Sequence, residues 1–142
     1  MKFNLPRLKM VFQRAAEACL TLRPGRETPL RNLEIVEAAV VSDACIAGLH
    51  RRFMGLEGPT DVLTFDHGEI VIGAGTASAN AALHGKALEE ELALYIIHGL
   101  LHLHGFDDKE PADAAEMART QESILRAVWP GGMGPGMKNE TV

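Results

Sequence analysis

The chain has 142 residues, which fits one domain and leaves little room for a second. Apolar residues make up 46% of the sequence and charged residues 23%, so fibrous, low-complexity and globally disordered proteins are excluded. The net charge of −5 also excludes a strongly basic nucleic-acid-binding protein.

Apolar runs such as Leu92–Ile97 are much shorter than the roughly 18 residues of a membrane span. The charged start of the chain, with Lys2 and Arg7, lacks the continuous apolar stretch of a secretory signal. Cys19 and Cys45 lie far apart and form no CxxC pair, so we expect two buried thiols and no disulfide. These features predict a cytoplasmic protein with no membrane partner.

Helical and strand-like patterns alternate in the first half of the chain. Apolar residues recur at helical spacing over residues 7–22 and 44–53, and Ser42 or Asp43 can cap the second helix. Strand-like runs fall at residues 33–41, 62–65 and 69–72, and a turn at residues 66–68 joins the last two.

The second half of the chain is helical. Residues 76–83 and 113–128 show helical spacing, and a helix from Leu88 is apolar all round after its acidic start, which places it at the centre of the domain. Gly105 ends this helix, and the Gly- and Pro-rich tail at residues 130–142 predicts disorder. We therefore predict one α+β domain over residues 1–129, with a small sheet packed against helices.

The segment that carries chemistry is residues 98–108, HGLLHLHGFDD, at the end of the central helix. His98 and His102 are four residues apart and project from one face of the helix, where two imidazoles can bind one metal ion. Gly105 allows a sharp turn that can bring Asp108 back to the same ion as a third ligand. This H-x3-H-x5-D spacing is metzincin-like.

Alternatives stay open within this segment. The two histidines can be core residues satisfied by hydrogen bonds, although their spacing before an acidic pair favours metal binding. Asp107 is the alternative to Asp108 as the third ligand. His104 projects from another side of the helix and is a weaker candidate, expected at the surface or behind the ligands.

Gly99 occupies the position where zinc proteases with this spacing carry a catalytic glutamate. The helix therefore offers no general base, and the catalytic residue stays unassigned, with a metal-bound water as the expected nucleophile. We expect the glycine to leave room for a bulky anionic substrate near the metal.

These residues resemble the bacterial YbeY family. HGLLHLHGFDD is similar to the H-G-x-L-H-L-x-G-Y-D-H motif of that family, and residues 58–65, GPTDVLTF, are similar to its K-P-T-D-V-L-S-F segment. Residues 68–72, GEIVI, and 89–92, EEEL, resemble its G-D-I-V-I strand and its E-E-E-L helix start. The resemblance covers about residues 40–128 in the right order.

The resemblance implies a small mixed sheet with helices and a zinc site between them, with one Zn²⁺ per chain bound by His98 and His102. It implies an endoribonuclease specific for single-stranded RNA. Such an enzyme would act in ribosomal RNA maturation, including the 3′ end of 16S RNA, and in late quality control of the small subunit and the whole ribosome. The expected partners are ribosomal RNA and proteins of the small subunit, and not DNA.

Two residues depart from the family pattern. Asp108 replaces a third histidine, which lowers the charge of the site and makes the ion a weaker Lewis acid. Met54, in Phe53-Met54-Gly55, stands where the family has the arginine of Y-R-G, a natural clamp for phosphate. Arg51 and Arg52 are weak candidates for substrate binding in its place, since on a helix they point elsewhere.

Two other functions stay open. The missing arginine favours a ribosome-assembly factor that binds RNA or protein without cutting. The metzincin-like spacing favours a metal hydrolase acting on peptides, which Gly99 opposes.

Overall fold

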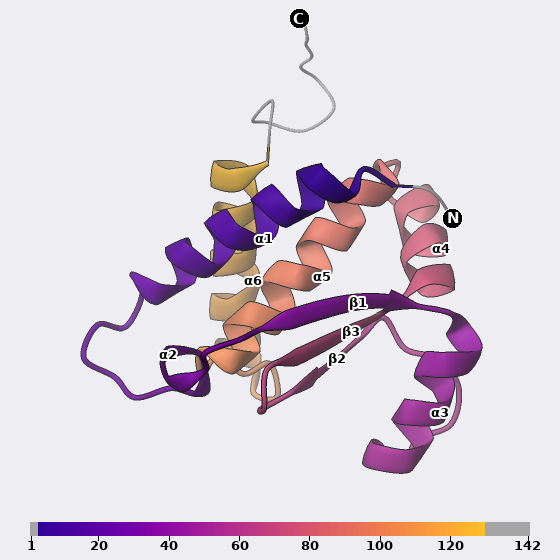
Figure 1. The fold of residues 1–142 in the computed structure, drawn as a ribbon, viewed down its shortest axis with the longest axis horizontal. Coiled ribbons are helices and arrows are strands. Elements are labelled where there is room, and N and C mark those ends of the chain that lie inside the picture. The colour runs from indigo at the N-terminus through magenta and orange to yellow at the C-terminus, as the bar shows by residue number, and fades with distance from the viewer. Residues whose placement is uncertain (1–2, 130–142) are drawn as a thin grey trace, which may run out of the picture.

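Helix α5 (Leu88–Leu103) runs through the middle of the molecule in a computed structural model that describes residues 3–129 (Figure 1). It is buried on nearly every side, as its apolar sequence predicts. None of the helices in this part of the chain is long and apolar enough to cross a membrane. The tail predicted to be disordered, residues 130–142, lies outside the described residues. The helices packed beside α5 include α1 (Leu5–Leu20), α4 (Ala74–Leu83) and α6 (Pro111–Val128).

A mixed sheet lies against α5 (Figure 1). Within the described residues its strands are β1 (Glu37–Val41), β2 (Val62–Phe65) and β3 (Glu69–Gly73), in the order β1-β3-β2. β1 runs parallel to β3 and β2 runs antiparallel to it. The predicted α+β fold with a small mixed sheet is therefore confirmed, and β1 and β2 are its edges.

The two faces of the sheet build two separate cores, because successive strand residues point to opposite sides. Ile70 and Ile72 of β3 are fully buried in the main core around α5. Val71 instead packs with Leu63 of β2 and Ile46 of α3 (Asp43–Met54). Helix α3 therefore covers the opposite face of the sheet.

One short helix was not predicted, α2 (Pro29–Asn32). Thr28 caps it, and the backbone N–H of Leu33 donates to the carbonyl of Pro29 at 3.1 Å. Because Leu33 closes this helical turn, the strand predicted over residues 33–41 shortens to Glu37–Val41. The other predicted helices and strands are present, with ends that shift by at most two residues.

Helix α3 begins and ends at local signals that place Met54. The hydroxyl of Ser42 accepts a hydrogen bond from the N–H of Cys45 at 3.1 Å, so Ser42 rather than Asp43 is the N-cap. Gly55, at φ +70°, ends the helix in the left-handed conformation. Met54 is therefore the last residue of α3.

The two cysteines have different environments. Cys19 is buried as predicted, and burial raises the pKa of its thiol to about 12. Cys45 is exposed, so the prediction of a buried thiol was wrong there. Its neighbour Ile46 takes the buried side of the first turn of α3, which turns Cys45 towards solvent.

Candidate metal centre

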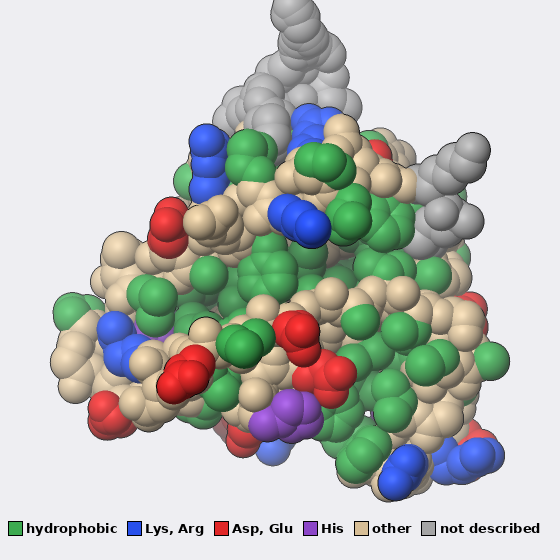
Figure 2. All heavy atoms as spheres, viewed as in Figure 1, with side chains coloured by type: hydrophobic (Ala, Val, Ile, Leu, Met, Phe, Trp, Pro, Cys, Tyr) green, Lys and Arg blue, Asp and Glu red, His purple; other side chains and the backbone are tan. Residues whose placement is uncertain are grey.

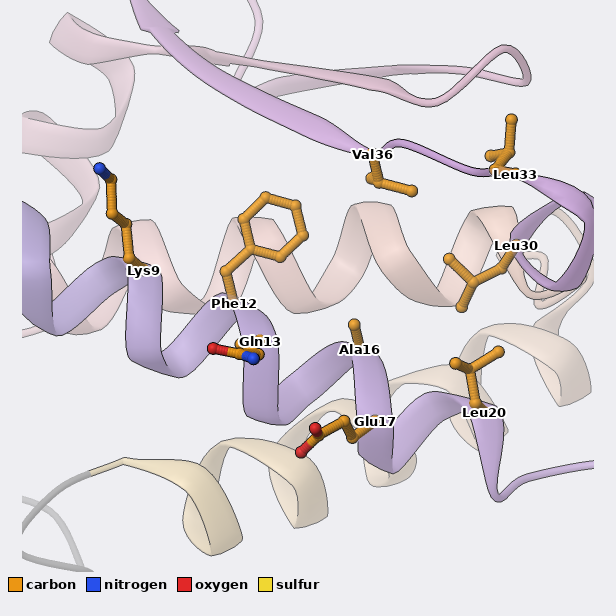
Figure 3. Close-up of a pocket in the computed structure, with 9 residues that line it drawn as sticks. All are labelled: Lys9, Phe12, Gln13, Ala16, Glu17, Leu20, Leu30, Leu33 and Val36. Carbon is orange, nitrogen blue, oxygen red and sulfur yellow. The ribbon is translucent and has the colours of Figure 1, made fainter.

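An apolar groove lies between α1 and the segment that leads into β1. It has a volume of about 420 Å³, and apolar side chains gather in this part of the surface (Figure 2). Phe12 and Ala16 point from α1 towards Val36 (Figure 3). Its lining contains no histidine or cysteine, and Glu17 is its one acidic residue, so it has no metal-binding cluster.

A larger hollow of about 810 Å³ contains the predicted ligands. It is bounded by the last turn of α3, by β2, by the C-terminal half of α5 and by the loop that follows α5. His98, His102 and Asp108 all lie in its lining. We refer to it as the metal hollow.

Three ligand atoms converge in the metal hollow. The Nε2 atoms of His98 and His102 are 3.1 Å apart. Oδ2 of Asp108 lies 3.7 Å from Nε2 of His98 and 3.8 Å from Nε2 of His102. The three residues form a group that could hold a metal ion, with ligand atoms within 4.8 Å of one another.

Hydrogen bonds at the opposite ring nitrogens orient both histidines. Nδ1 of His102 is 3.1 Å from the carbonyl oxygen of Phe106, which can only accept, so Nδ1 donates. Nδ1 of His98 donates to Oε1 of Gln121, on α6, at 2.8 Å. The two Nε2 atoms then face each other, and a cation between them could be bound by both rings.

The chemistry of this group fits zinc. Two imidazole nitrogens and a carboxylate oxygen are ordinary zinc ligands, with bonds of about 2.0–2.2 Å. Tetrahedral ligands on such bonds stand about 3.3–3.6 Å apart, and the observed 3.1 to 3.8 Å brackets that range. Burial lowers the pKa of His102, His98 lowers it further, and Asp108 opposes both. The lowered pKa favours the neutral imidazole, which is the form that binds a metal.

The two neighbouring aspartates differ in what they contact. Oδ1 of Asp107 accepts hydrogen bonds from the backbone N–H groups of Asp108, at 2.7 Å, and Lys109, at 3.2 Å. Asp107 therefore stabilises the turn of the loop, while Asp108 faces the histidines. This geometry favours Asp108 over Asp107 as the third ligand.

Arg23 holds the ligand loop against the body of the protein. Its Nη1 donates to the carbonyl of Gly105 at 3.1 Å, and its guanidinium lies 3.7 Å from the ring centroid of Phe106. Its Nη2 pairs with Glu116 of α6 at 3.1 Å. Gly105 takes φ +90°, which lets the chain reverse and carry Asp108 back to α5.

Two expectations about this helix were wrong. A Cβ at Gly99 would lie 2.8 Å from Cγ2 of Ile70, so the glycine lets α5 pack on β3 and leaves no room for substrate. His104 is fully buried, and it donates from Nε2 to the carbonyl of Leu22 at 2.8 Å and accepts at Nδ1 from Thr28 at 3.0 Å. His104 follows the last helical residue, so helical spacing did not predict its direction.

The residues at the end of α3 divide into two pairs. Arg51 and Arg52, the weak candidates for substrate binding, are exposed, and neither lines the metal hollow. Phe53 and Met54 do line it. The position at which the resemblance implies a phosphate-binding arginine is therefore beside the candidate ligands, and it holds Met54.

Gln121 is a candidate positioning residue that the sequence did not predict. It lies 23 residues after His98, on α6, and reaches the imidazole only because α6 packs against α5. No local spacing pattern contains that information.

Most of the chain is similar to known proteins. Residues 2–128 match the family described as Endoribonuclease YbeY. The endoribonuclease YbeY of Moorella thermoacetica is 38% identical over 112 residues, which cover 66% of this chain and 72% of the relative. The endoribonuclease YbeY of Parafrankia sp. is 33% identical over 142 residues, which cover 86% of this chain and 87% of the relative. The solution structure of a Thermotoga maritima protein has a TM-score of 0.60 and 28% identity, covering 90% of this chain and 85% of its own. The chain belongs to the YbeY endoribonuclease family.

Proposed function

We propose that the chain is a zinc-dependent endoribonuclease that cuts single-stranded RNA. The observation that carries the proposal is the convergence of His98, His102 and Asp108 in one open hollow. Membership of a family whose members are named endoribonucleases supplies the class of substrate. A zinc ion held there would supply Lewis-acid chemistry at a phosphodiester group.

The protein's own groups hold and orient the site. His98 and His102 turn their Nε2 atoms towards the ion site, because Gln121 and the carbonyl of Phe106 bind the opposite ring nitrogens. Asp108 completes a set of three protein ligands and leaves the side towards β2 and Met54 for RNA. No side chain is assigned as a general base.

We infer that the biological substrate is ribosomal RNA, including the 3′ end of 16S RNA, and that the chain acts in late quality control of ribosomes. Proteins of the small ribosomal subunit would be its partners, in the cytoplasm where ribosomes assemble. Family membership is the support for this part of the proposal.

A second candidate function is a ribosome-assembly factor that binds RNA without cutting it. Met54 favours it, because a thioether beside the candidate ligands cannot clamp a phosphate as a guanidinium does. A metal hydrolase acting on peptides has no support beyond the ligand spacing.

The decisive experiment measures the zinc content of the purified chain and its cleavage of a single-stranded RNA oligonucleotide. We expect about one zinc ion per chain and zinc-dependent cleavage. His102→Ala and Asp108→Asn should lose both properties, since each removes a ligand.

Two matched variants serve as controls. Asp107→Asn keeps the carbonyl oxygen that accepts from the loop backbone, and His84→Ala changes an exposed histidine at the end of α4, so both should keep the zinc. A wild-type chain that stays free of zinc in an excess of the metal would rule out the proposed nuclease. A chain that binds zinc and RNA but never cuts would identify the assembly factor.

A further inference from the structure

Three aromatic rings lie in a row beside the metal hollow. Phe53 is in the last turn of α3, Phe65 ends β2, and His67 is in the turn between β2 and β3. The ring centroids of Phe53 and Phe65 are 5.3 Å apart, edge to face, and those of Phe65 and His67 are 5.7 Å apart, nearly parallel at 22°. Separate elements thus bring aromatic faces together at one place.

The outer rings of this row are open to solvent. Phe53 is 54% exposed, and the side chain of His67 is 69% exposed. Phe65 lies between them and is partly buried. Exposed aromatic rings in a row offer flat apolar surface to a flat partner, because stacking removes that surface from water.

Two of the three rings share the hollow with the candidate ligands. Phe53 and Phe65 line the same hollow as His98, His102 and Asp108. A molecule lying on Phe53 and Phe65 is therefore in the same hollow as the metal site, and His67 extends the row of rings beyond its lining.

Charge alone does not explain how this hollow would hold RNA. The guanidinium of Arg52 lies 5.3 Å from the ring centroid of Phe53, and Lys109 lines the hollow on the loop side. Asp66 and Asp107 lie in the same lining, and the whole chain carries a net charge of −5. Phosphate contacts are therefore few, and contacts to the bases must contribute much of the affinity.

We propose that Phe53, Phe65 and His67 are a stacking platform for unpaired nucleobases, which holds single-stranded RNA over the metal site. This inference rests on the proposed nuclease function and names the feature that selects its substrate. Bases in a duplex have both faces covered by their neighbours, whereas unpaired bases can splay out onto aromatic rings. The platform therefore selects single strands without reading their sequence.

The test compares binding of three fluorescent oligonucleotides to the zinc-loaded chain: a single-stranded RNA, an abasic strand with the same number of phosphates, and a duplex. Phe53→Leu and His67→Asn each remove one exposed ring. We expect each to weaken binding of the single strand roughly fivefold to a hundredfold and to leave binding of the abasic strand unchanged. Phe12→Leu is the matched control, because it makes the same change in the apolar groove beside α1 and should bind as the wild type does.

The two proposals fail in different ways. Equal binding of the single strand and the abasic strand, or unchanged binding by Phe53→Leu and His67→Asn, overturns the platform. The exposed ring of Phe53 would then serve a protein partner together with Met54 and Leu56, which are also exposed. Absence of cleavage by the zinc-loaded wild type overturns the nuclease. Base-dependent binding that Phe53→Leu weakens would support the platform even in that case.

Discussion

Met54 is the residue that most affects what the metal hollow can do with a phosphate. It lines the hollow beside His98, His102 and Asp108, and its side chain is largely exposed. A thioether is a weak acceptor with no proton to donate, whereas a guanidinium can donate two parallel hydrogen bonds to one phosphate group. The lining of the hollow therefore has no guanidinium at position 54 that could bind a phosphate through two hydrogen bonds.

Met54→Arg should increase cleavage of single-stranded RNA. A charge-assisted pair of hydrogen bonds is worth about 1.5–3 kcal/mol, so we expect kcat/KM to rise about tenfold to a hundredfold. The measurement is the initial rate of cleavage by the zinc-loaded variant at several RNA concentrations.

Leu56→Arg is the control for the added charge. Leu56 is also exposed, two residues further on, and does not line the metal hollow. An equal rise in both variants would show that net charge, and not a clamp at position 54, limits cleavage. No rise in either variant, with zinc bound, would favour the assembly factor.

At the scale of the elements, the position of α5 on the sheet depends on Gly99. An added Cβ would lie 2.8 Å from Cγ2 and 2.9 Å from Cδ1 of Ile70, which is fully buried in β3. Gly99→Ala should therefore destabilise the protein by about 1–3 kcal/mol, since overpacking forces buried side chains from their places. Unfolding in urea measures this change.

Gly48 provides the matched control on another helix. It lies inside α3, and a Cβ there would meet nothing within 4 Å. Gly48→Ala should therefore be neutral or stabilise by up to about 1 kcal/mol, through helix propensity alone. If Gly99→Ala were as well tolerated, α5 would not sit as close to β3 as the structure shows. A smaller cost of Gly99→Ala in an Ile70→Ala background would locate the clash, because Ile70→Ala removes all three atoms that the added Cβ would meet.

The sequence predicted elements where a local pattern determines them and failed where packing does. The burial of α5 was predicted from its apolar composition, and the N-cap of α3 was predicted at Ser42 or Asp43. Both are local signals, and the structure confirms the burial and selects Ser42. The buried position of His104 and the contact of Gly99 with Ile70 depend on partners far away in sequence. The helical turn closed by Leu33 is the exception, because its cap Thr28 and its first residue Pro29 are local signals that the prediction did not use. The spacing of His98, His102 and Asp108 predicted the candidate ligands because one helix turn and one glycine bring them together.

At the scale of the whole molecule, α1 is held by contacts with both α5 and α6. The guanidinium of Arg7 lies 4.4 Å from the ring centroid of Trp129, just beyond the end of α6. Cys19 is fully buried near the other end of α1, so its thiol meets solvent only when α1 separates from the body of the protein. Its reactivity therefore reports the integrity of the whole fold.

Two variants, each with one cysteine, compare the two thiols: Cys45→Ala keeps only Cys19, and Cys19→Ala keeps only the exposed Cys45. At pH 8, Cys19 in the first variant should react with a thiol reagent at least about a hundredfold more slowly than Cys45 in the second. The thiolate is the reactive form, and the pKa of Cys19 is raised to about 12 by burial, so almost none is present at that pH. The rates are measured from the absorbance of the released reagent.

The same assay in urea distinguishes exposure of Cys19 by local opening of α1 from its exposure by unfolding of the whole domain. If α1 stays docked until the domain unfolds, the rate for Cys19 should rise with urea in step with the global transition, while the rate for Cys45 changes little. Fast labelling of Cys19 without urea would mean that α1 opens on its own. Arg23, which holds the ligand loop through Gly105, follows α1 directly, so such opening should also loosen the loop that carries Asp108. Zinc bound at that site should then slow the labelling of Cys19, because an ion that binds only the closed form stabilises it.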